Sequence, residues 1–254
     1  MSLAPEGLTV VPLKGIPQVR PGDDLARFLA DAIASGKSPL TESDVLVVAQ
    51  KVVSKAEGAT VRLEDVTPGK DALAVAETVN KDPRLVEVIL SESKRIVRSV
   101  PGVLITETHH GLICANAGVD ASNSLHEGVV VLLPRDPDGS ARRIRTGIAQ
   151  LTGKRIGVVV SDTFNRPWRN GSINVAIGTA GFEPLDDRRG TTDDVGHALR
   201  VTVVSIADEV ASAAQLVMGE AGGIPAVLVQ GLVVSRSEIG SGGLLRDPER
   251  DLFR

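Results

Sequence analysis

Short apolar runs and longer amphipathic stretches alternate along this 254-residue chain. Apolar runs of this length are typical of buried strands, and they predict strands over residues 7–13, 44–50, 96–100, 103–115, 129–133, 158–162, 199–204 and 226–231. Apolar residues spaced three and four apart predict helices over residues 24–34, 70–79, 82–92, 138–151 and 207–217. The run 103–115 predicts a hairpin of two strands, because His109, His110 and Gly111 interrupt it as a turn would.

The order of these elements indicates the fold class. Helices and strands mix without the regular strand–helix–strand repeat of a parallel sheet, and a hairpin lies in the middle of the chain. A chain of 254 residues can bury a sizeable core as one large domain or as two small ones. We predict a single α+β domain over residues 1–254, with a mixed sheet, packed helices and two lobes.

Composition argues against several classes of function. A net charge of −4 and a pI near 5.6 argue against a broad nucleic-acid surface, which needs clustered Lys and Arg. Aromatic residues make up 2% of the chain, so stacking on flat ligands has little to use apart from Trp168. No window approaches about 20 uninterrupted apolar residues, and the N-terminus lacks a basic start followed by an apolar stretch. We therefore expect a cytoplasmic protein without a membrane partner.

The single cysteine and the histidines favour structural roles. Cys114 cannot form an intramolecular disulfide, and its apolar neighbours predict a buried and inert thiol. His109, His110, His126 and His197 do not follow the spacings of zinc ligands. We expect them at turns or on the surface.

The segment 158–171 carries the densest chemistry in the chain. Its apolar run ends in Asp162 and Thr163, and two arginines and a tryptophan follow within a few residues. A carboxylate and a hydroxyl at a strand end can hold Mg²⁺ or Mn²⁺, and Arg166 and Arg169 can bind anionic oxygens. The alternative for each arginine is a surface salt bridge. The segment predicts a site for a metal and a phosphate group.

Two further carboxylates, Asp120 and Glu220, lie in glycine-rich loops. Taken singly, Asp120 and Asp162 could be ordinary turn or cap residues. Lys51 and Lys55 bring positive charge near a strand end, and hard oxygen ligands beside cations are typical of phosphoryl-transfer sites. Because the chain lacks both a P-loop and the Rossmann glycine motif, its residues alone predict a metal-dependent nucleotide or phosphate enzyme on an unusual scaffold.

Four motifs occur in order along nearly the whole chain. They are GIPQVRPGDDL (15–25), QKVVSKAEG (50–58), AGVDASN (117–123) and SDTFNRPWRNG (161–171). In these motifs, and in the segments 196–202, 207–214 and 245–254, the chain resembles the coenzyme F420:L-glutamate ligase family, also called the F420-0:gamma-glutamyl ligases. Four motifs at compatible spacing are more specific than any one of them.

The resemblance implies a reaction and its participants. Members of the family join L-glutamate to the lactyl carboxylate of the deazaflavin precursor F420-0, and then add further glutamates through γ-linkages. GTP first phosphorylates the carboxylate to an acyl phosphate, and the amine of glutamate then displaces phosphate. The resemblance also implies a divalent metal (Mg²⁺ or Mn²⁺), K⁺ as a monovalent cation, and a homodimer with intertwined lobes.

The resemblance also assigns roles to individual residues. The metal ligands are expected to be Asp120, Asp162, Thr163 and Glu220. The GTP contacts are expected from Ile16, Pro17, Gln18, Val19, Gln50, Lys55, Asn123, Met218, Gly219, Glu220, Ala221, Gly222, Gly223, Ile224 and Pro225. Asp162, Arg166 and Arg169 form the catalytic set. The two arginines are assigned by chemistry, because F420-0 and glutamate bring a phosphodiester and carboxylates that a bidentate cation can bind.

The chain departs from the family pattern in two respects, and two alternative functions stay open. Gln50 stands where the family is expected to have Ser or Thr, and no nitroreductase-like flavin domain follows, so we expect the stand-alone form. One alternative is a related nucleotide-dependent carboxylate–amine ligase with another acceptor, because acceptor specificity depends on pocket shape. The other is a nucleotide-binding regulator without catalysis, against which the set Asp120, Asp162 and Thr163 argues.

Overall fold

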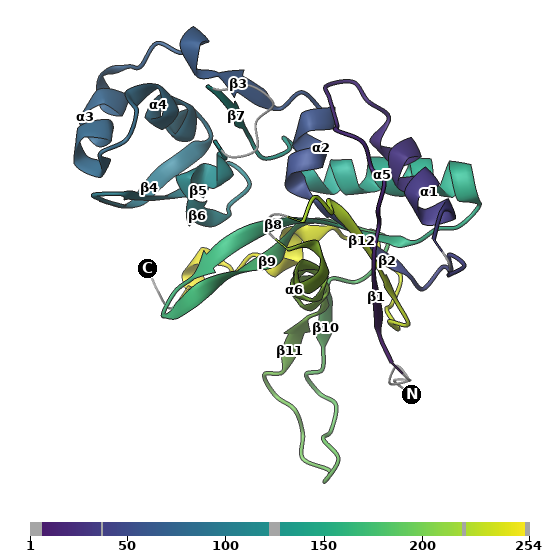
Figure 1. Ribbon diagram of the computed structural model, residues 1–254. Helices are drawn as coiled ribbons and strands as arrows, with labels where there is room; N and C mark the ends of the chain where they lie inside the picture. The colour runs from purple at the N-terminus through teal and green to yellow at the C-terminus, as the bar shows by residue number, and fades with distance from the viewer. Residues whose placement is uncertain (1–6, 37, 122–127, 220–221, 252–254) are drawn as a thin grey trace.

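A five-stranded mixed sheet forms the centre of the molecule (Figure 1). The computed structural model describes residues 7–36, 38–121, 128–219 and 222–251. In order across the sheet, the strands are β1 (Thr9–Pro12), β12 (Ala226–Gln230), β2 (Val45–Ala49), β8 (Gly157–Arg166) and β9 (Arg169–Ala180). Strands β2 and β8 run parallel, and the other neighbours run antiparallel. The predicted α+β class with a mixed sheet is confirmed.

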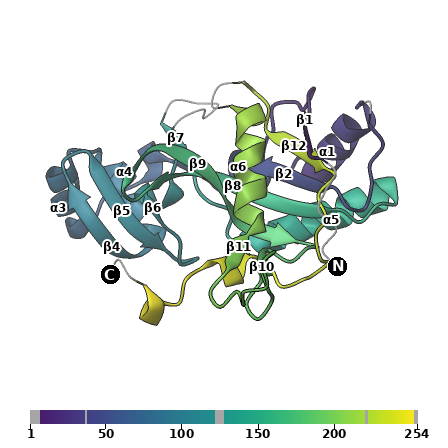
Figure 2. The same ribbon diagram turned by 90° about the horizontal axis from the view of Figure 1, so that it is seen from below.

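Helices cover both faces of this sheet. Helices α1 (Leu25–Ala34), α2 (Gln50–Ala56) and α5 (Pro137–Thr152) lie on one face, and α6 (Ile206–Met218) lies on the other (Figures 1 and 2). Successive side chains of a strand point to opposite faces. Leu46 and Val48 therefore pack with α1 and α5, while Val45 and Val47 pack with α6. Because both faces are buried, the sequence of β2 is continuously apolar.

A smaller group of elements packs around a core of its own. It contains α3 (Lys70–Val79), α4 (Pro83–Ser91), the sheet of β4 (Ser93–Val100), β5 (Val103–Thr108) and β6 (Ile113–Ala115), and the pair β3 (Thr60–Arg62) and β7 (Val129–Val131). Val79, Val86, Ile89 and Leu104 form the centre of this core. Strand β5 pairs antiparallel with β6, which confirms the predicted hairpin. Strand β6 also lies beside β8 of the central sheet.

Local signals in the sequence set the ends of the helices. Asp24 caps α1 by accepting a hydrogen bond from the backbone N–H of Arg27, and Asp136 caps α5 in the same way from Gly139. Helix α5 ends at Thr152 and is capped by Gly153, whose φ of +72° suits glycine. Short 3-10 turns lie at Leu63–Asp65, Asn116–Gly118, Ser241–Leu244 and Pro248–Arg250. Among the described residues, no helix is long and apolar enough to cross a membrane.

Two predicted strands differ most from the structure in their limits, and Gln50, predicted as the last residue of a strand, begins α2 instead. Strand β8 does not end at Asp162 but continues to Arg166, because hydrogen bonds to β9 keep it extended where the covering helices stop. The strand predicted at 199–204 is reduced to β11 (Val203–Ser205), which pairs with β10 (Leu185–Asp187). This ribbon projects from the body (Figure 1), and Val201 is 86% exposed. Since no second layer covers residues 199–202, their apolar character does not make them a strand.

Candidate functional site

A cavity of about 630 Å³ opens where the parallel strands β2 and β8 come to the edge of their helical layers. Ligands in open sheets commonly bind beyond the carboxyl ends of parallel strands. Here five segments meet: the loop after β1, the β2–α2 junction, the middle of β8, β9, and the end of α6 with the loop that follows it. The lining residues are Ile16, Pro17, Gln18, Val19, Ala49, Gln50, Lys51, Val52, Lys55, Ser161, Asp162, Thr163, Asn174, Gln215, Met218, Gly219, Gly223, Ile224 and Pro225.

The residues predicted to contact a nucleotide gather at this cavity. All those that the structure describes line it except Gly222. The remaining three predicted contacts, Asn123, Glu220 and Ala221, lie outside the described residues. Pairing between β12 and β2 explains much of this convergence, because the backbone N–H of Ala49 donates to the carbonyl of Pro225 at 2.8 Å. The glycine-rich loop after α6 is thereby placed beside the start of α2.

The predicted metal ligands are divided between the cavity and its rim. Asp162 and Thr163 line the cavity, whereas Asp120 forms an ion pair with the lining residue Lys51. Glu220 lies outside the described residues. In the described ranges, no three His, Cys, Asp or Glu side chains come together in a group that could hold a metal ion. Of the predicted ligands, the described part of the site therefore offers two carboxylates and one hydroxyl as hard oxygen donors.

Asn174 on β9 orients the hydroxyl of Thr163, and the sequence did not single it out. The Thr163 hydroxyl donates to Asn174 Oδ1 at 2.8 Å. Asn174 is only 6% exposed, and its own backbone N–H donates to Gln215 Oε1 of α6 at 2.7 Å. A hydroxyl has one proton to donate, so both lone pairs of Thr163 remain for a cation or a donor in the cavity. A buried Asn between apolar strand residues was the signal that could have revealed this position.

Two lysines of α2 supply positive charge at the cavity. Burial lowers the pKa of Lys55, the nearby ammonium of Lys51 lowers it further, and the Asp120 carboxylate acts in the opposite direction. The Lys51 ammonium is paired with Asp120. Partial desolvation strengthens the attraction of Lys55 for an anion, because less water screens it. The arrangement favours a negatively charged ligand next to α2.

Gln50 begins α2 and is almost fully buried, with 2% of its surface exposed. Its Oε1 accepts a hydrogen bond from the Ser54 hydroxyl at 2.9 Å. The side-chain oxygen is therefore used within α2 itself. The side-chain N–H₂ group of Gln50 can still donate hydrogen bonds to a ligand.

A β-bulge lies directly before Asp162. Val160 pairs with Gly178 but Ser161 pairs with Ala176, so β9 has one extra residue at this point. Bulges redirect the side chains beside them and are frequent next to active sites. Gly178 also allows β9 to approach α5 closely, since a Cβ there would lie 2.4 Å from the backbone of Pro137. Packing against α5 thus fixes the bulge that precedes Asp162.

The two predicted catalytic arginines lie away from the cavity lining. Arg166 and Arg169 pair with each other at the tip of the β8–β9 hairpin. The Arg166 guanidinium donates to the carbonyl of Asn170 at 3.0 Å and, more weakly, to that of Gly171 at 3.5 Å. Four residues of strand separate Arg166 from Asp162, which corresponds to about 13 Å. The structure therefore brings Asp162 to the cavity and leaves the arginines further along the hairpin.

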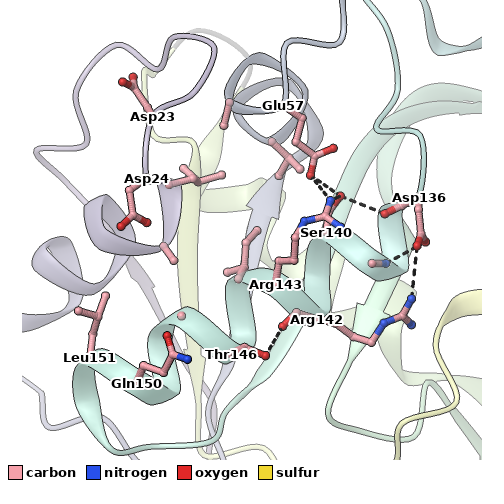
Figure 3. A pocket seen from close by; sticks show the side chains of 17 residues that line it. Asp23, Asp24, Glu57, Asp136, Ser140, Arg142, Arg143, Thr146, Gln150 and Leu151 are labelled. Atoms are coloured by element: carbon pink, nitrogen blue, oxygen red, sulfur yellow. Dashed lines mark hydrogen bonds and ion pairs between the residues drawn. The ribbon is translucent and has the colours of Figure 1, made fainter.

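A second cavity, of about 770 Å³, lies between α1, α2 and α5 (Figure 3). Its lining contains four carboxylates and includes none of the predicted site residues. Glu57 accepts hydrogen bonds from Ser140 and from Arg143, each at 2.6 Å. A lining rich in carboxylates that are already bonded does not suit a polyanion. Its contribution to the site is indirect, because Glu57 ties the end of α2 to α5.

Cys114 on β6 approaches the site from the smaller group of elements. Burial, and to a lesser degree the Asp162 carboxylate, raises the pKa of the Cys114 thiol to about 12. The thiol therefore stays protonated at neutral pH, and the predicted buried position is confirmed.

The fold and the cavity define a class of protein: an α+β protein that combines a carboxylate, a hydroxyl and two lysines at a sheet edge without a P-loop. Residues 15–231 match the family F420-0:Gamma-glutamyl ligase, and the chain belongs to this family. It is 45% identical over 251 residues to the coenzyme F420:L-glutamate ligase of Methanothermobacter thermautotrophicus, covering 98% of this chain and 99% of that protein. It is 45% identical over 256 residues to that of Methanopyrus kandleri, with coverage of 98% and 99%. The corresponding protein of Archaeoglobus fulgidus is 42% identical over 246 residues, with 96% of each chain covered.

Proposed function

We propose that this protein is a GTP-dependent ligase that joins L-glutamate to the lactyl carboxylate of F420-0 and then adds further γ-linked glutamates. The observation that carries the proposal is the convergence of five separate segments on one cavity that contains Asp162, Thr163 and Lys55. Full-length relatives named coenzyme F420:L-glutamate ligase support the choice of acceptor and amino acid.

The donors at the cavity fit a divalent metal. Mg²⁺ is usually bound through one or two carboxylates together with substrate phosphates and water. Asp162 and Thr163 would hold Mg²⁺ or Mn²⁺, with Asp120 at the rim and Glu220 as a further ligand. When bound, the metal would neutralise negative charge on the phosphates of GTP.

The protein's own residues would position GTP. Lys55 is a compact and partly desolvated charge, suited to the oxygens of the terminal phosphates. Lys51 would hold Asp120 in place through their ion pair. The loop 16–19 and the glycine-rich loop 222–225 would enclose the nucleoside, since both border the cavity that Lys55 faces.

The proposed reaction has two steps. A carboxylate oxygen of the acceptor attacks the γ-phosphorus of GTP, the bond from that phosphorus to the bridging oxygen breaks, and GDP and an acyl phosphate result. The amine nitrogen of glutamate then attacks the acyl carbon, the C–O bond to phosphate breaks, and the nitrogen loses a proton as the amide forms. Arg169 would bind the anionic groups of the two acids, while Arg166 orders the hairpin turn and adds charge there.

One incubation tests the proposal. Purified protein is mixed with F420-0, L-glutamate, GTP and Mn²⁺, and the products are analysed by mass spectrometry for glutamate additions. Asp162→Asn serves as the inactive control, because it keeps the shape but removes the charge. Absence of product with GTP binding retained would favour the regulatory alternative, and product with ATP but not with GTP would contradict the nucleotide assignment.

We also propose a homodimer and a role for K⁺. The β10–β11 ribbon projects from the body and carries the exposed side chains Val195 (70%) and Val201 (86%), which a second copy could bury (Figure 1). Light scattering after gel filtration should give twice the monomer mass of 26.5 kDa. Replacing K⁺ by Na⁺ in the assay should lower turnover, and equal rates in both salts would remove K⁺ from the proposal.

A further inference from the structure

Glu57 is the C-cap residue of helix α2 and does not line the cavity around Asp162. It belongs to the motif QKVVSKAEG, which supplies Gln50, Lys51 and Lys55 to that cavity. Residues two positions apart on a helix point about 200° apart, so Lys55 and Glu57 leave α2 on nearly opposite sides. Lys55 lines the cavity of the site, whereas Glu57 lines the second cavity beside α5.

Three side chains form a closed triangle at this end of α2 (Figure 3). The Ser140 hydroxyl and the Arg143 guanidinium of α5 both donate to Glu57 Oε1 at 2.6 Å, and Arg143 also donates to Ser140 Oγ at 3.0 Å. Ser140 is 1% exposed and the side chain of Glu57 is 28% exposed. Hydrogen bonds to a charged group are the stronger kind, and partial burial strengthens them further. The triangle therefore joins the end of α2 firmly to α5.

Helix α2 depends on such links for its position. It has seven residues and no capping side chain at its N-terminus, and a helix so short is not stable on its own. Its start continues directly from strand β2 of the central sheet. Beside its last turn, however, Val53 and Ala56 border the cavity of about 770 Å³, so close packing does not fix this side of the turn. The last turn is joined to the loop before α1 by the N–H of Gly22, and to the buried face of α5 by Glu57.

We infer that Glu57 is a positioning residue for Lys55: by tying the end of α2 to α5, it sets where the Lys55 ammonium meets the terminal phosphates of GTP. This inference rests on the proposed function. Lys55 lies in the turn that Glu57 closes, because the N–H of Glu57 donates to the carbonyl of Val53 at 3.0 Å. A shift of this turn therefore moves Lys55 with it, and a displacement of about 1 Å in a positioning contact can cost about 100-fold in rate.

Charge and position predict opposite effects of Glu57→Ala on the binding of GTP. The substitution removes a negative charge near Lys55, which by Coulomb's law alone would strengthen the binding of an anion. Loss of the correct position should instead raise the Kd for GTP about tenfold, as is typical when the partner that orients a ligating group is removed. Glu57→Gln removes the same charge but keeps the Oε1 acceptor, so it should bind GTP at least as tightly as wild type.

Calorimetric titration with a non-hydrolysable GTP analogue in the presence of Mn²⁺ measures this Kd without turnover. Lys55→Met/Glu57→Ala should bind the analogue as weakly as Lys55→Met alone, because both residues act through one contact. In the ligation assay, the KM of Glu57→Ala for glutamate should stay within about twofold of wild type, since α2 contacts the nucleotide side of the site. Glu238→Ala, which removes an ion pair to Arg145 of the same helix α5 at 2.8 Å, is the matched control and should keep the wild-type Kd.

Three outcomes overturn the inference: a wild-type Kd in Glu57→Ala, a Kd of Glu57→Gln as weak as that of Glu57→Ala, or additive losses with Lys55→Met. If Glu57→Ala does not fold, Ser140→Ala removes one of the two bonds and should raise the Kd about threefold, and an unchanged Kd there overturns the inference equally. If wild type binds the analogue but forms no product, the proposed ligation fails, and the titration still decides the role of Glu57. If wild type does not bind the analogue, both fail.

Discussion

Replacing Asn174 by alanine should impair catalysis far more than stability. The substitution removes the side-chain oxygen that accepts the Thr163 hydroxyl at 2.8 Å. It also removes two long contacts of the amide, to Ser161 Oγ at 3.5 Å and to Met218 Sδ at 3.8 Å. The bonds that join the backbone of Asn174 to Gln215 and Ser212 remain, because they do not involve its side chain.

The cost in stability can be worked out from these contacts. One neutral hydrogen bond contributes about 0.5–1.5 kcal/mol net, and Thr163 is exposed enough to bond water instead. The small void left in a buried position adds roughly another 1 kcal/mol. A total of about 1–2.5 kcal/mol is well below the ~5–15 kcal/mol that typically holds a domain folded. Asn174→Ala should therefore fold, with a melting temperature lowered by a few degrees.

The expected loss of activity is larger. Residues that orient a metal ligand typically contribute about 10–100-fold to metal affinity or activity. In the mass-spectrometric or GDP-release assay, Asn174→Ala should need a higher Mn²⁺ concentration for half-maximal rate and should turn over about 10–100-fold more slowly at low Mn²⁺. Asn170→Ala, the same substitution at an exposed position of the same strand, is the matched control and should behave as wild type.

A double-mutant cycle identifies the route of the effect. If Asn174 acts through Thr163, then Thr163→Ala and the double variant Thr163→Ala/Asn174→Ala should have the same rate. Additive losses would show that Asn174 acts elsewhere in the cavity. A Mn²⁺ dependence of Asn174→Ala that equals that of wild type would refute the reasoning altogether.

Three further predictions follow from the site. Burial and Lys51 lower the pKa of Lys55 below 10.5. Between the lowered pKa and 10.5, the folded state therefore binds fewer protons than the unfolded chain. Below that pH window, the charged Lys55 destabilises the folded state by its full amount. Lys55→Met should therefore raise the melting temperature at pH 7 while lowering GTP-dependent turnover about 100-fold; an unchanged rate would exclude Lys55 from phosphate binding. Gly178→Ala should lower the free energy of unfolding by about 1–3 kcal/mol in a denaturant titration, because its Cβ would meet the backbone of Pro137. In the control Gly242→Ala the Cβ meets nothing within 4 Å, so the free energy of unfolding should change by less than about 0.5 kcal/mol. Chelation with EDTA should abolish ligation, and Mg²⁺ or Mn²⁺ should restore it; activity that survives chelation would argue against a metal.

The sequence predicted five of the six α-helices that the structure describes, but it missed α2 (Gln50–Ala56), where it predicted only the last residue of a strand, because α2 is short and has no capping side chain. Asp24 and Asp136 cap α1 and α5, and apolar residues at helical spacing record which face is buried. It was less reliable for strands at the edge of the molecule. At 158–162 the apolar run ended where the cover of helices ended, and β8 itself continued to Arg166. Hydropathy records burial, whereas the length of a strand depends on its pairing partner.

In the candidate site, too, some residues could be predicted from the sequence and others could not. The family resemblance pointed to Asp162, Thr163 and Lys55, and the structure brings these three residues to one cavity. The sequence missed Asn174 and Gln215, because their importance comes from bonds to residues that lie far away in the chain.

By itself, the sequence determined the described helices other than α2, the buried strand β2 and the residue types that could carry phosphate chemistry. Only the tertiary structure decided which of them share a cavity. The pairing of β12 with β2 and of β2 with β8 brings residues near 18, 50, 162 and 223 together, and the β8–β9 hairpin holds Trp168 and the arginines about 13 Å further out. Local periodicity reports only the faces that each segment buries. Partners distant in the chain are chosen by strand pairing and packing, which no single segment contains.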